Sequence, residues 1–300
     1  MTTGAPLCVA PTGDRCGEGA VWDDGRQRLY WTDINRFLIH RYNPADKSVQ
    51  SWFFEEPVTA VTLTSQDDML AVVLGSRLIL WNPETDKRVN HRFYLRDWPY
   101  VRLNDARVDP RGSLWLGSMR NNVRPDGSAG EAGGTDGVLY RLDPDGAVTE
   151  WKHEIGIANT LVWNPAKDRF YFADTLKNKV WRYDYDVSTG GISHERPVLL
   201  DFPRGLPDGS AMDSEGYLWN CRYGGGCIVR VGPNDLVDEV IEMPTTNITT
   251  CTFGGVNRRT LYVTTASSGA PEGDRLAGGL FALPTQVPGQ RENRFHVRYR

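Results

Sequence analysis

The sequence predicts an all-β fold, a six-bladed β-propeller with four short antiparallel strands in each blade. One strand–turn–strand pattern recurs six times, with a period of about 40–55 residues that is typical of propeller blades. No long amphipathic helical pattern interrupts the repeats. Gly (31), Tyr (12) and Trp (10) are abundant, which suits many short strands joined by tight turns. We therefore expect residues 1–300 to form one propeller domain.

Each copy of the pattern has an apolar strand, a turn rich in Asp, Asn, Gly or Pro, an apolar-aromatic strand and usually a third strand. The six copies occupy residues 20–44, 60–83, 106–144, 161–184, 210–231 and 251–283. Their second strands are predicted at residues 28–33, 69–73, 114–118, 170–174, 217–219 and 260–265. Their third strands are predicted at residues 37–44, 78–83, 137–144, 180–184, 227–231 and 279–283.

Two segments fall outside the repeats. The ring of blades must close, and we expect a strand from one terminus, such as residues 7–9, to pair with one near the other, such as residues 294–297. Residues 121–136, in the third copy, are polar and rich in Gly. We expect this insert to be a loop over one face, with a lid as one interpretation of its role.

Charge and composition exclude several classes of function. The net charge of −4 and the pI of about 5.8 give no basic footprint for a nucleic acid. No apolar run is long enough to span a membrane, and the first residues do not form a signal peptide. Five scattered cysteines without a CxxC pair favour reduced thiols. We therefore expect a cytoplasmic protein with a small-molecule partner.

Polar residues stand just before the first strand of four copies. They are Glu18 in copy one, Asn104 and Asp105 in copy three, Asn159 in copy four and Asp208 in copy five. Taken singly, each residue has the ordinary interpretation of a turn residue or a strand cap. Because the inner strands of a propeller converge on a central channel, their matching positions predict one shared site.

The chemistry of these side chains favours a hard divalent cation. Carboxylate and amide oxygens suit Ca²⁺, Mg²⁺ or Mn²⁺ and are tolerated by Zn²⁺. The five histidines show no spacing typical of metal ligands. A nucleophilic hydrolase is not supported, because the sequence has no GxSxG motif and no Ser or Cys in an activating context. The glycines at 224–226 are followed by no strand-to-helix context, so a tight strand connection is favoured over a phosphate-binding loop.

Five motifs resemble, in order and over nearly the whole chain, those of the senescence-marker-protein (regucalcin)/gluconolactonase family of sugar lactonases. The motifs are CGEGAVWD at 16–23, RLND at 102–105, GLPDG at 205–209, YGGG at 223–226 and TTCTFGG at 249–255. The resemblance implies the same six-bladed propeller, with one divalent metal ion in its channel.

The resemblance also implies roles for individual residues. Glu18, Asn159 and Asp208 match the family's metal ligands. In the implied reaction Asp208 would both bind the metal and act as general base, or do only one of these. Arg102 and Asn104 match residues that contact the substrate, and Asp105 follows them in the same motif.

The chain departs from the family pattern at one ligand. Thr160 stands where the family usually has a glycine after the ligand Asn. Because a β-branched residue resists positive φ, we expect the backbone at this position to differ from that of the family.

The implied reaction is the hydrolysis of a sugar lactone to an aldonic acid. A metal would polarise the ester carbonyl and acidify a water molecule, while Arg102 and Asn104 would orient the sugar. As a sharper hypothesis, Arg120 and Arg222, with Arg124 in the insert, would receive an anionic substituent on the sugar. The alternative interpretation places these arginines on the solvent-exposed rim.

Two other classes of function remain as alternatives. One is a non-catalytic propeller that binds calcium or protein, because the tetrapeptide YWTD at 30–33 is typical of receptor propellers, although it occurs here only once. The other is an arylesterase of the paraoxonase type or a strictosidine-synthase-like enzyme, which would favour apolar aromatic substrates. A comparison of rates on aryl esters and sugar lactones separates these enzymes.

Overall fold

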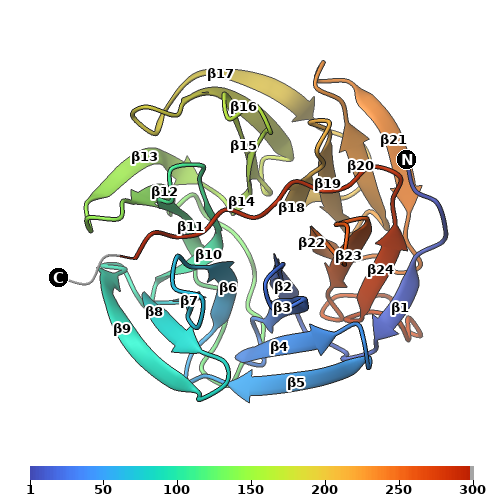
Figure 1. The fold of residues 1–300 in the computed structure, drawn as a ribbon, viewed down its shortest axis with the longest axis horizontal. Helices are drawn as coiled ribbons and strands as arrows, with labels where there is room; N and C mark the ends of the chain where they lie inside the picture. Colours follow the sequence, from blue (N-terminus) through green and yellow to red (C-terminus); the bar gives the residue numbers. More distant parts are fainter. Residues whose placement is uncertain (298–300) are drawn as a thin grey trace.

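Six four-stranded antiparallel sheets form a ring in the computed structural model, which describes residues 1–297 (Figure 1). The first strands of neighbouring blades contact one another all the way around the ring, so these strands surround the central channel. The described residues contain no α-helix, and none of them forms a helix long and apolar enough to cross a membrane. The predicted six-bladed propeller is confirmed.

The first three blades follow the order of the chain. Blade 1 consists of β2 (Gly17–Asp23), β3 (Arg28–Asp33), β4 (Leu38–Asn43) and β5 (Ser48–Phe53). Blade 2 consists of β6 (Val58–Leu63), β7 (Leu70–Leu74), β8 (Arg77–Asn82) and β9 (Lys87–Tyr94). Blade 3 consists of β10 (Val101–Val108), β11 (Leu114–Arg120), β12 (Gly137–Leu142) and β13 (Val148–Ile155).

The last three blades include the one that closes the ring. Blade 4 consists of β14 (Ala158–Trp163), β15 (Arg169–Asp174), β16 (Lys179–Asp186) and β17 (Gly191–Leu200). Blade 5 consists of β18 (Leu206–Met212), β19 (Leu218–Tyr223), β20 (Cys227–Val231) and β21 (Val237–Glu242). Blade 6 consists of β22 (Ile248–Gly254), β23 (Thr260–Thr265), β24 (Leu280–Pro284) and β1 (Leu7–Ala10).

Turns with a buried Asp stabilise the junction between the first and second strands of two blades. In blade 3, Asp109 accepts hydrogen bonds from the backbone of Arg111 and Ser113 and, at 3.0 Å, from the indole of Trp115. In blade 5, Asp213 forms the same bond to the indole of Trp219 at 3.0 Å. One carboxylate thus caps a turn and satisfies a buried indole N–H, which explains why these turn residues are fully buried.

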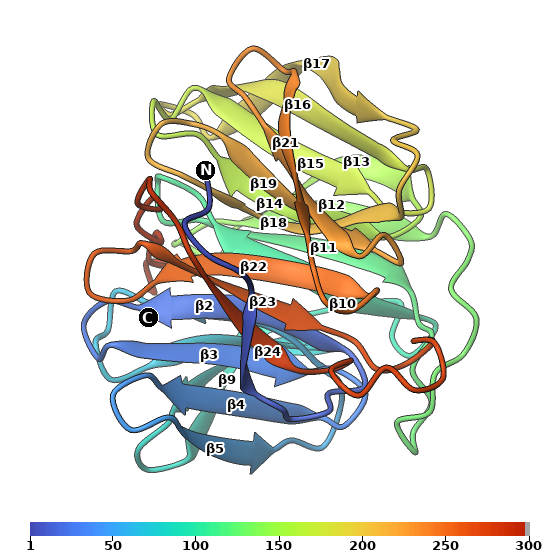
Figure 2. The same cartoon turned by 90° about the vertical axis from the view of Figure 1, so that its right-hand side faces the viewer.

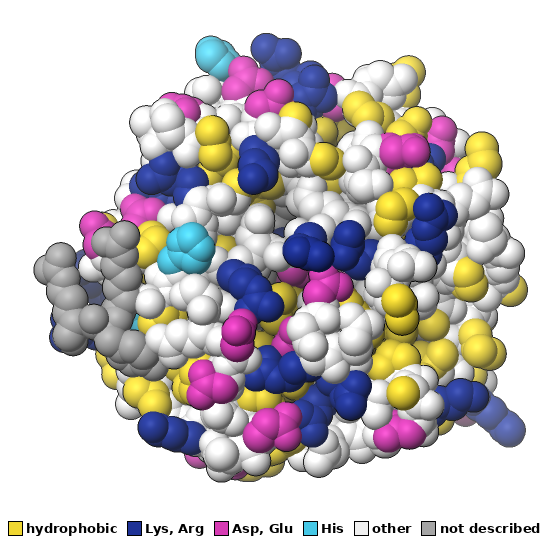
Figure 3. Space-filling model, viewed as in Figure 1, with side chains coloured by type: hydrophobic (Ala, Val, Ile, Leu, Met, Phe, Trp, Pro, Cys, Tyr) yellow, Lys and Arg dark blue, Asp and Glu magenta, His cyan; other side chains and the backbone are white. Residues whose placement is uncertain are grey.

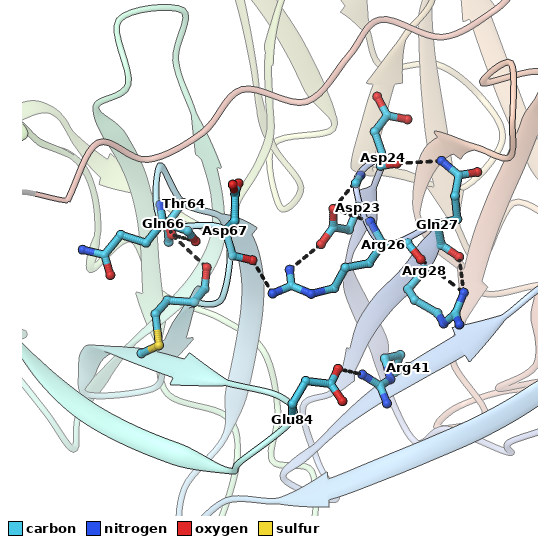
Figure 4. Close-up of polar contacts among 12 residues, drawn as sticks. Asp23, Asp24, Arg26, Gln27, Arg28, Arg41, Thr64, Gln66, Asp67 and Glu84 are labelled. Atoms are coloured by element: carbon cyan, nitrogen blue, oxygen red, sulfur yellow. Dashed lines mark hydrogen bonds and ion pairs between the residues drawn. The ribbon is translucent and has the colours of Figure 1, made fainter.

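Polar contacts join blades 1 and 2 at the face viewed in Figure 1. Arg26 forms an ion pair with Asp23 at 2.7 Å and donates a hydrogen bond to the backbone carbonyl of Asp67 in blade 2 (Figure 4). Farther from the channel, Arg41 pairs with Glu84. These contacts add to the apolar side chains that pack between the two blades, such as Tyr30 and Trp81.

The prediction of how the ring closes was half right. The N-terminal strand β1 does complete the last blade, but its partner is β24, with Leu7 opposite Ala282. Residues 294–297 do not pair with it, and Phe295 instead forms a parallel bridge with Thr64 of blade 2. The reason is that blade 6 has three strands from the C-terminal part of the chain and only its outer edge is open to β1.

Residues 288–297, which we call the strap, cross one mouth of the channel (red in Figure 1). The backbone of the strap forms hydrogen bonds with Arg258, Met212, Ser214, Gly112, Leu63 and Ser65, which lie in or beside blades 6, 5, 3 and 2. The side chain of Gln290 reaches blade 4, and Arg291 pairs with Asp24 of blade 1 at 3.1 Å. Acidic and basic side chains are interspersed on this face (Figure 3). The strap therefore ties all six blades together.

The insert at residues 121–136 is a loop, as predicted, between β11 and β12. It lies on the face opposite the strap, where it projects as a green loop in Figure 2. The carbonyl of Gly127 accepts hydrogen bonds from Asn35 at 3.0 Å and Arg15 at 3.3 Å, and both of these donors belong to blade 1. Val123 packs against Ile34 and Phe37 of the same blade. The insert thus reaches from blade 3 to blade 1.

Candidate metal and substrate site

Every inner strand has a register irregularity near its start, on the face of the insert. In the four strands that carry candidate residues, the irregularities follow Glu18, Leu103, Asn159 and Pro207. A bulge of this kind rotates the backbone and changes the direction of the side chains beside it. The repeated bulges therefore explain how strands that otherwise bury apolar residues present polar groups to the channel.

The structure brings the carboxylates of Glu18 and Asp208 close enough for each to shift the pKa of the other. Both residues are buried, with exposed fractions of 8% and 7%. Burial raises the pKa of Glu18 well above its usual value, and the charges of Asp208 and Asp105 raise it further. Burial and then the charge of Asp105 raise the pKa of Asp208 in the same way. The half-buried Asp105 therefore adds negative charge beside two buried acids that already repel each other.

Asp105 lies on the strap side of the other two acids. Its carboxylate accepts a hydrogen bond from the backbone of Ala106 at 2.8 Å, and the nearby backbone N–H groups of Leu161 and Thr160 act to lower its pKa. Burial raises its pKa, and the neighbouring Arg107 opposes this shift. Asp105 and Arg107 line a cavity of about 20 Å³, which has room for about one water molecule.

Arg102 and Asn104 form a hydrogen-bonded chain that leads to the third predicted ligand. Nη1 of Arg102 donates to Oδ1 of Asn104 at 2.7 Å, and Nδ2 of Asn104 donates to the carbonyl of Ala158 at 2.9 Å and to Oδ1 of Asn159 at 3.3 Å. On its other side Arg102 donates to Oδ1 of Asn122 through Nε and Nη2. Burial lowers the pKa of Arg102 to about 10, so its guanidinium remains charged at neutral pH.

The backbone beside Asn159 does not differ in the way that the sequence led us to expect. Thr160 adopts a φ of +55°, close to the +57° of Gly19, which follows Glu18 in blade 1. The positive φ is therefore present despite the β-branched side chain. The hydroxyl of Thr160 donates to the carbonyl of Asp208 at 2.5 Å, and this contact holds the residue in place.

Arg120 lies apart from the acids. Its side chain is 54% exposed and forms an ion pair with Asp136 at the other end of the insert, with an Nε–Oδ2 distance of 2.8 Å. Arg124 donates within the insert to the carbonyl of Ala129. Neither contact brings these arginines to Glu18 or Asp208.

Arg222 is fully buried, and neighbouring groups of the protein accept its hydrogen bonds. It donates to the carbonyls of Arg204 at 3.0 Å and Gly205 at 2.7 Å, and to Oδ1 of Asn178 at 2.7 Å. These bonds support the loop that leads into β18, the strand of Asp208. The geometry thus favours a bracing role for Arg222 over direct contact with a substrate.

Three residues near the site were not among the sequence candidates. Asn122 binds Arg102, and only its place at the start of the insert could have suggested it. Cys16 stands two residues before Glu18, and burial, followed by the charges of Glu18 and Asp208, raises its pKa well above its usual value. Burial, with smaller effects from Cys16 and Asp208, raises the pKa of Tyr223 to about 12. Cys16 and Tyr223 belong to the motifs at 16–23 and 223–226, and this membership was the sequence signal that could have identified them.

The donor set fits a hard divalent cation. Within residues 1–297, no group of three or more His, Cys, Asp or Glu side chains is arranged to hold a metal ion, and the candidate set supplies only two carboxylates with one amide oxygen. Carboxylate and amide oxygens are nevertheless the ligands that such cations prefer. The buried repulsion between Glu18 and Asp208 would be relieved by a cation between them.

Comparison with known proteins gives a consistent result. Residues 16–267 match the family described as SMP-30/gluconolactonase/LRE-like region. The chain is 36% identical to the pentonolactonase XacC of Haloferax volcanii, over 97% of this chain and 98% of that one. It is 33% identical to human regucalcin, over 92% and 93% of the two chains.

Solved structures agree with these sequence matches. The regucalcin of Agrobacterium tumefaciens, described as a calcium-binding protein, superposes with a TM-score of 0.89 and 25% identity over 98% of both chains. A luciferin-regenerating enzyme superposes with a TM-score of 0.87 and 27% identity, over 98% of this chain and 99% of that one.

Proposed function

Because the chain belongs to the SMP-30/gluconolactonase/LRE-like family, we propose that it is a divalent-metal-dependent hydrolase that opens a sugar lactone to the aldonic acid. Two relatives named as lactonases match this chain over nearly their whole length, which supports the reaction class. The observation that carries the proposal is the pair of buried carboxylates of Glu18 and Asp208, with the Asn159 amide linked through Thr175 to the carbonyl of Pro207, the residue before Asp208. Glu18, Asn159 and Asp208 would hold one Ca²⁺, Mg²⁺, Mn²⁺ or Zn²⁺ ion.

The bound cation would act as a Lewis acid that polarises the lactone carbonyl and makes a water molecule easier to deprotonate. Asp208 would accept the proton of the attacking water.

Arg102 would orient the substrate. A guanidinium carries two N–H groups on Nη2, and only one of them is taken up by Asn122, so one remains for a sugar oxygen. Both N–H groups of the Asn104 amide are used within the protein. We therefore propose that Asn104 chiefly aligns Arg102 with Asn159 and offers the substrate only its remaining acceptor capacity.

A hydrolysis screen with a pH indicator tests this proposal. The metal-stripped protein would be assayed on five- and six-carbon aldonolactones and on aryl esters, before and after each divalent ion is restored. We expect metal-dependent hydrolysis of at least one aldonolactone and much slower turnover of aryl esters. Metal binding without any hydrolysis would instead support a calcium-binding propeller, and preferred aryl-ester turnover would support an arylesterase.

A further inference from the structure

A threonine of blade 4 contacts the Asn159 amide and helps to set its orientation. Nδ2 of Asn159 lies 2.8 Å from Oγ1 of Thr175, which in turn lies 2.7 Å from the carbonyl of Pro207. A carbonyl can only accept, so the single hydroxyl proton of Thr175 goes to Pro207. The hydroxyl must then accept from the NH₂ group of Asn159. On the other side Asn104 donates to Oδ1 of Asn159, which fixes the same orientation.

Thr160 fastens the strand of Asn159 to the strand of Asp208. Its hydroxyl donates to the carbonyl of Asp208 at 2.5 Å and lies 2.8 Å from the hydroxyl of Ser210. Nδ2 of Asn220 approaches the same hydroxyl at 3.3 Å. Thr160 is fully buried and keeps a φ that β-branched residues resist, so these contacts hold an otherwise unfavourable backbone.

The third candidate ligand is held by a contact of the same kind. Thr249 of blade 6 donates to the carbonyl of Gly17 at 2.5 Å, immediately before Glu18 in blade 1. Each of the three hydroxyls thus crosses from one blade to the next and ends on a carbonyl at or beside a candidate ligand.

We propose that Thr160 and Thr175 are positioning residues of the metal site. Thr175 turns the oxygen of the Asn159 amide towards the cation, and Thr160 together with Thr175 fixes the Asp208 turn against the strand of Asn159. The proposal rests on the proposed metal-dependent function. It assigns to blade 4 both one ligand and the means of aligning a second ligand from blade 5.

Metal affinity is the direct test, measured by calorimetry on the metal-stripped protein with Mn²⁺ or Ca²⁺. Thr175→Val keeps the shape of the side chain but removes the acceptor of the Asn159 NH₂ group, which leaves only the longer 3.3 Å contact from Asn104 to orient the amide. It should weaken binding about 10-fold or more. Thr175→Ser keeps the hydroxyl and should bind nearly as the parent does. Thr64→Val is the matched control, because Thr64 is a buried threonine whose hydroxyl bonds the carbonyls of Gln66 and Met69 on the strap face.

A double-mutant cycle with Asn159→Asp distinguishes a lost orientation of the Asn159 amide from a general loosening of the site. Asn159→Asp presents an oxygen whichever way it turns, so Thr175→Val should cost much less affinity in that background. Equal losses in both backgrounds, or an unchanged affinity in Thr175→Val, would overturn the proposal. If Thr175→Val does not fold, Thr160→Val is measured in the same way, with Thr160→Ser as its rescue. A parent protein that binds no divalent ion and opens no lactone would instead refute the proposed function.

Discussion

Glu18, Asp105 and Asp208 concentrate negative charge where water has little access. The pKa values of all three are raised, chiefly by burial. Such an arrangement lowers the stability of the fold when the acids ionise without a counter-charge. A cation is therefore expected to contribute to stability as well as to chemistry.

The sign of this effect gives a pH-dependent prediction. The pKa values of Glu18 and Asp208 are higher in the folded state than in the unfolded state. The loss of folding stability that their ionisation causes is therefore absent below the unfolded pKa and grows as pH rises through the folded pKa. Added metal should therefore raise the melting temperature of the metal-free protein more at pH 7.5 than at pH 5. Metal at about 100 times its Kd would add about 2.7 kcal/mol. An equal or larger gain at pH 5, measured by thermal melting, would contradict the account.

Arg102 allows a test of substrate orientation. Lysine keeps the positive charge but loses the planar fork that bonds Asn104 and Asn122 together. We expect Arg102→Lys to lower kcat/KM for an aldonolactone about 10²-fold. The matched control is Arg120→Lys, since Arg120 pairs only with Asp136 at the surface, and it should leave kcat/KM unchanged. A selective loss on anionic sugars in Arg120→Lys would revive the anionic-substituent hypothesis.

At the scale of single residues, the sequence predicted the candidate acids but not the local backbone or burial of other residues of the site. Glu18 and Asp208 could be nominated because they stand before equivalent strands, and the structure places them together. The backbone at Thr160 could not be foreseen, because its φ depends on contacts with Asp208 and Ser210, about 50 residues away. The burial of Arg222 was hidden for the same reason, since its partners come from two other segments, at Asn178 and in the loop that contains Phe202 and Arg204.

At the scale of elements, the inner strands were the easiest to predict. Their apolar and aromatic runs are buried on both faces, as in β6, where all six residues are buried. Outer strands carry a weaker signal, because β5 has only one residue that is not exposed. The bulges that aim the site residues have no sequence signal of their own and were not predicted.

The insert provides a prediction about an element. Gly127 has a φ of +76°, and a Cβ added there would lie 2.1 Å from the carbonyl oxygen of Asn35. Gly127→Ala should therefore release the tip of the insert from blade 1. Because the insert also carries Asn122, the partner of Arg102, we expect KM for the lactone to rise several-fold with little change in melting temperature.

The control for this variant lies in the same loop. Gly133→Ala adds a Cβ with no atom within 4 Å and should leave KM unchanged. An unchanged KM in Gly127→Ala would mean that the docked insert has no part in binding the lactone.

For the whole molecule, closure depends on two features. Strand β1 completes blade 6, and the strap ties all six blades at the opposite mouth from the insert. The repeat pattern predicted the number of blades, but the two short segments 7–9 and 294–297 gave no indication of which strand each would join. Their places follow from the vacant edge of blade 6 and from the path across the channel.

The strap should therefore contribute measurably to global stability. Phe295 is 1% exposed and packs with apolar residues of blades 2 and 3. Phe295→Ala should cost about 3–5 kcal/mol, or roughly 6–10 °C in melting temperature. Val256→Ala, at a residue that is 85% exposed, should melt as the parent does. Coincident melting curves for Phe295→Ala and the parent would show that the strap is dispensable.

The central claim is that distant residues of three blades hold one catalytic cation in the channel. It is tested most directly by the initial rate of aldonolactone hydrolysis, measured while a divalent ion is titrated into the stripped parent protein, Glu18→Gln and Asp208→Asn. We predict no rate above background before addition, saturable recovery in the parent, and no recovery in either variant at the same ion concentrations. Full activity in the stripped parent, or equal recovery in both variants, would contradict the claim.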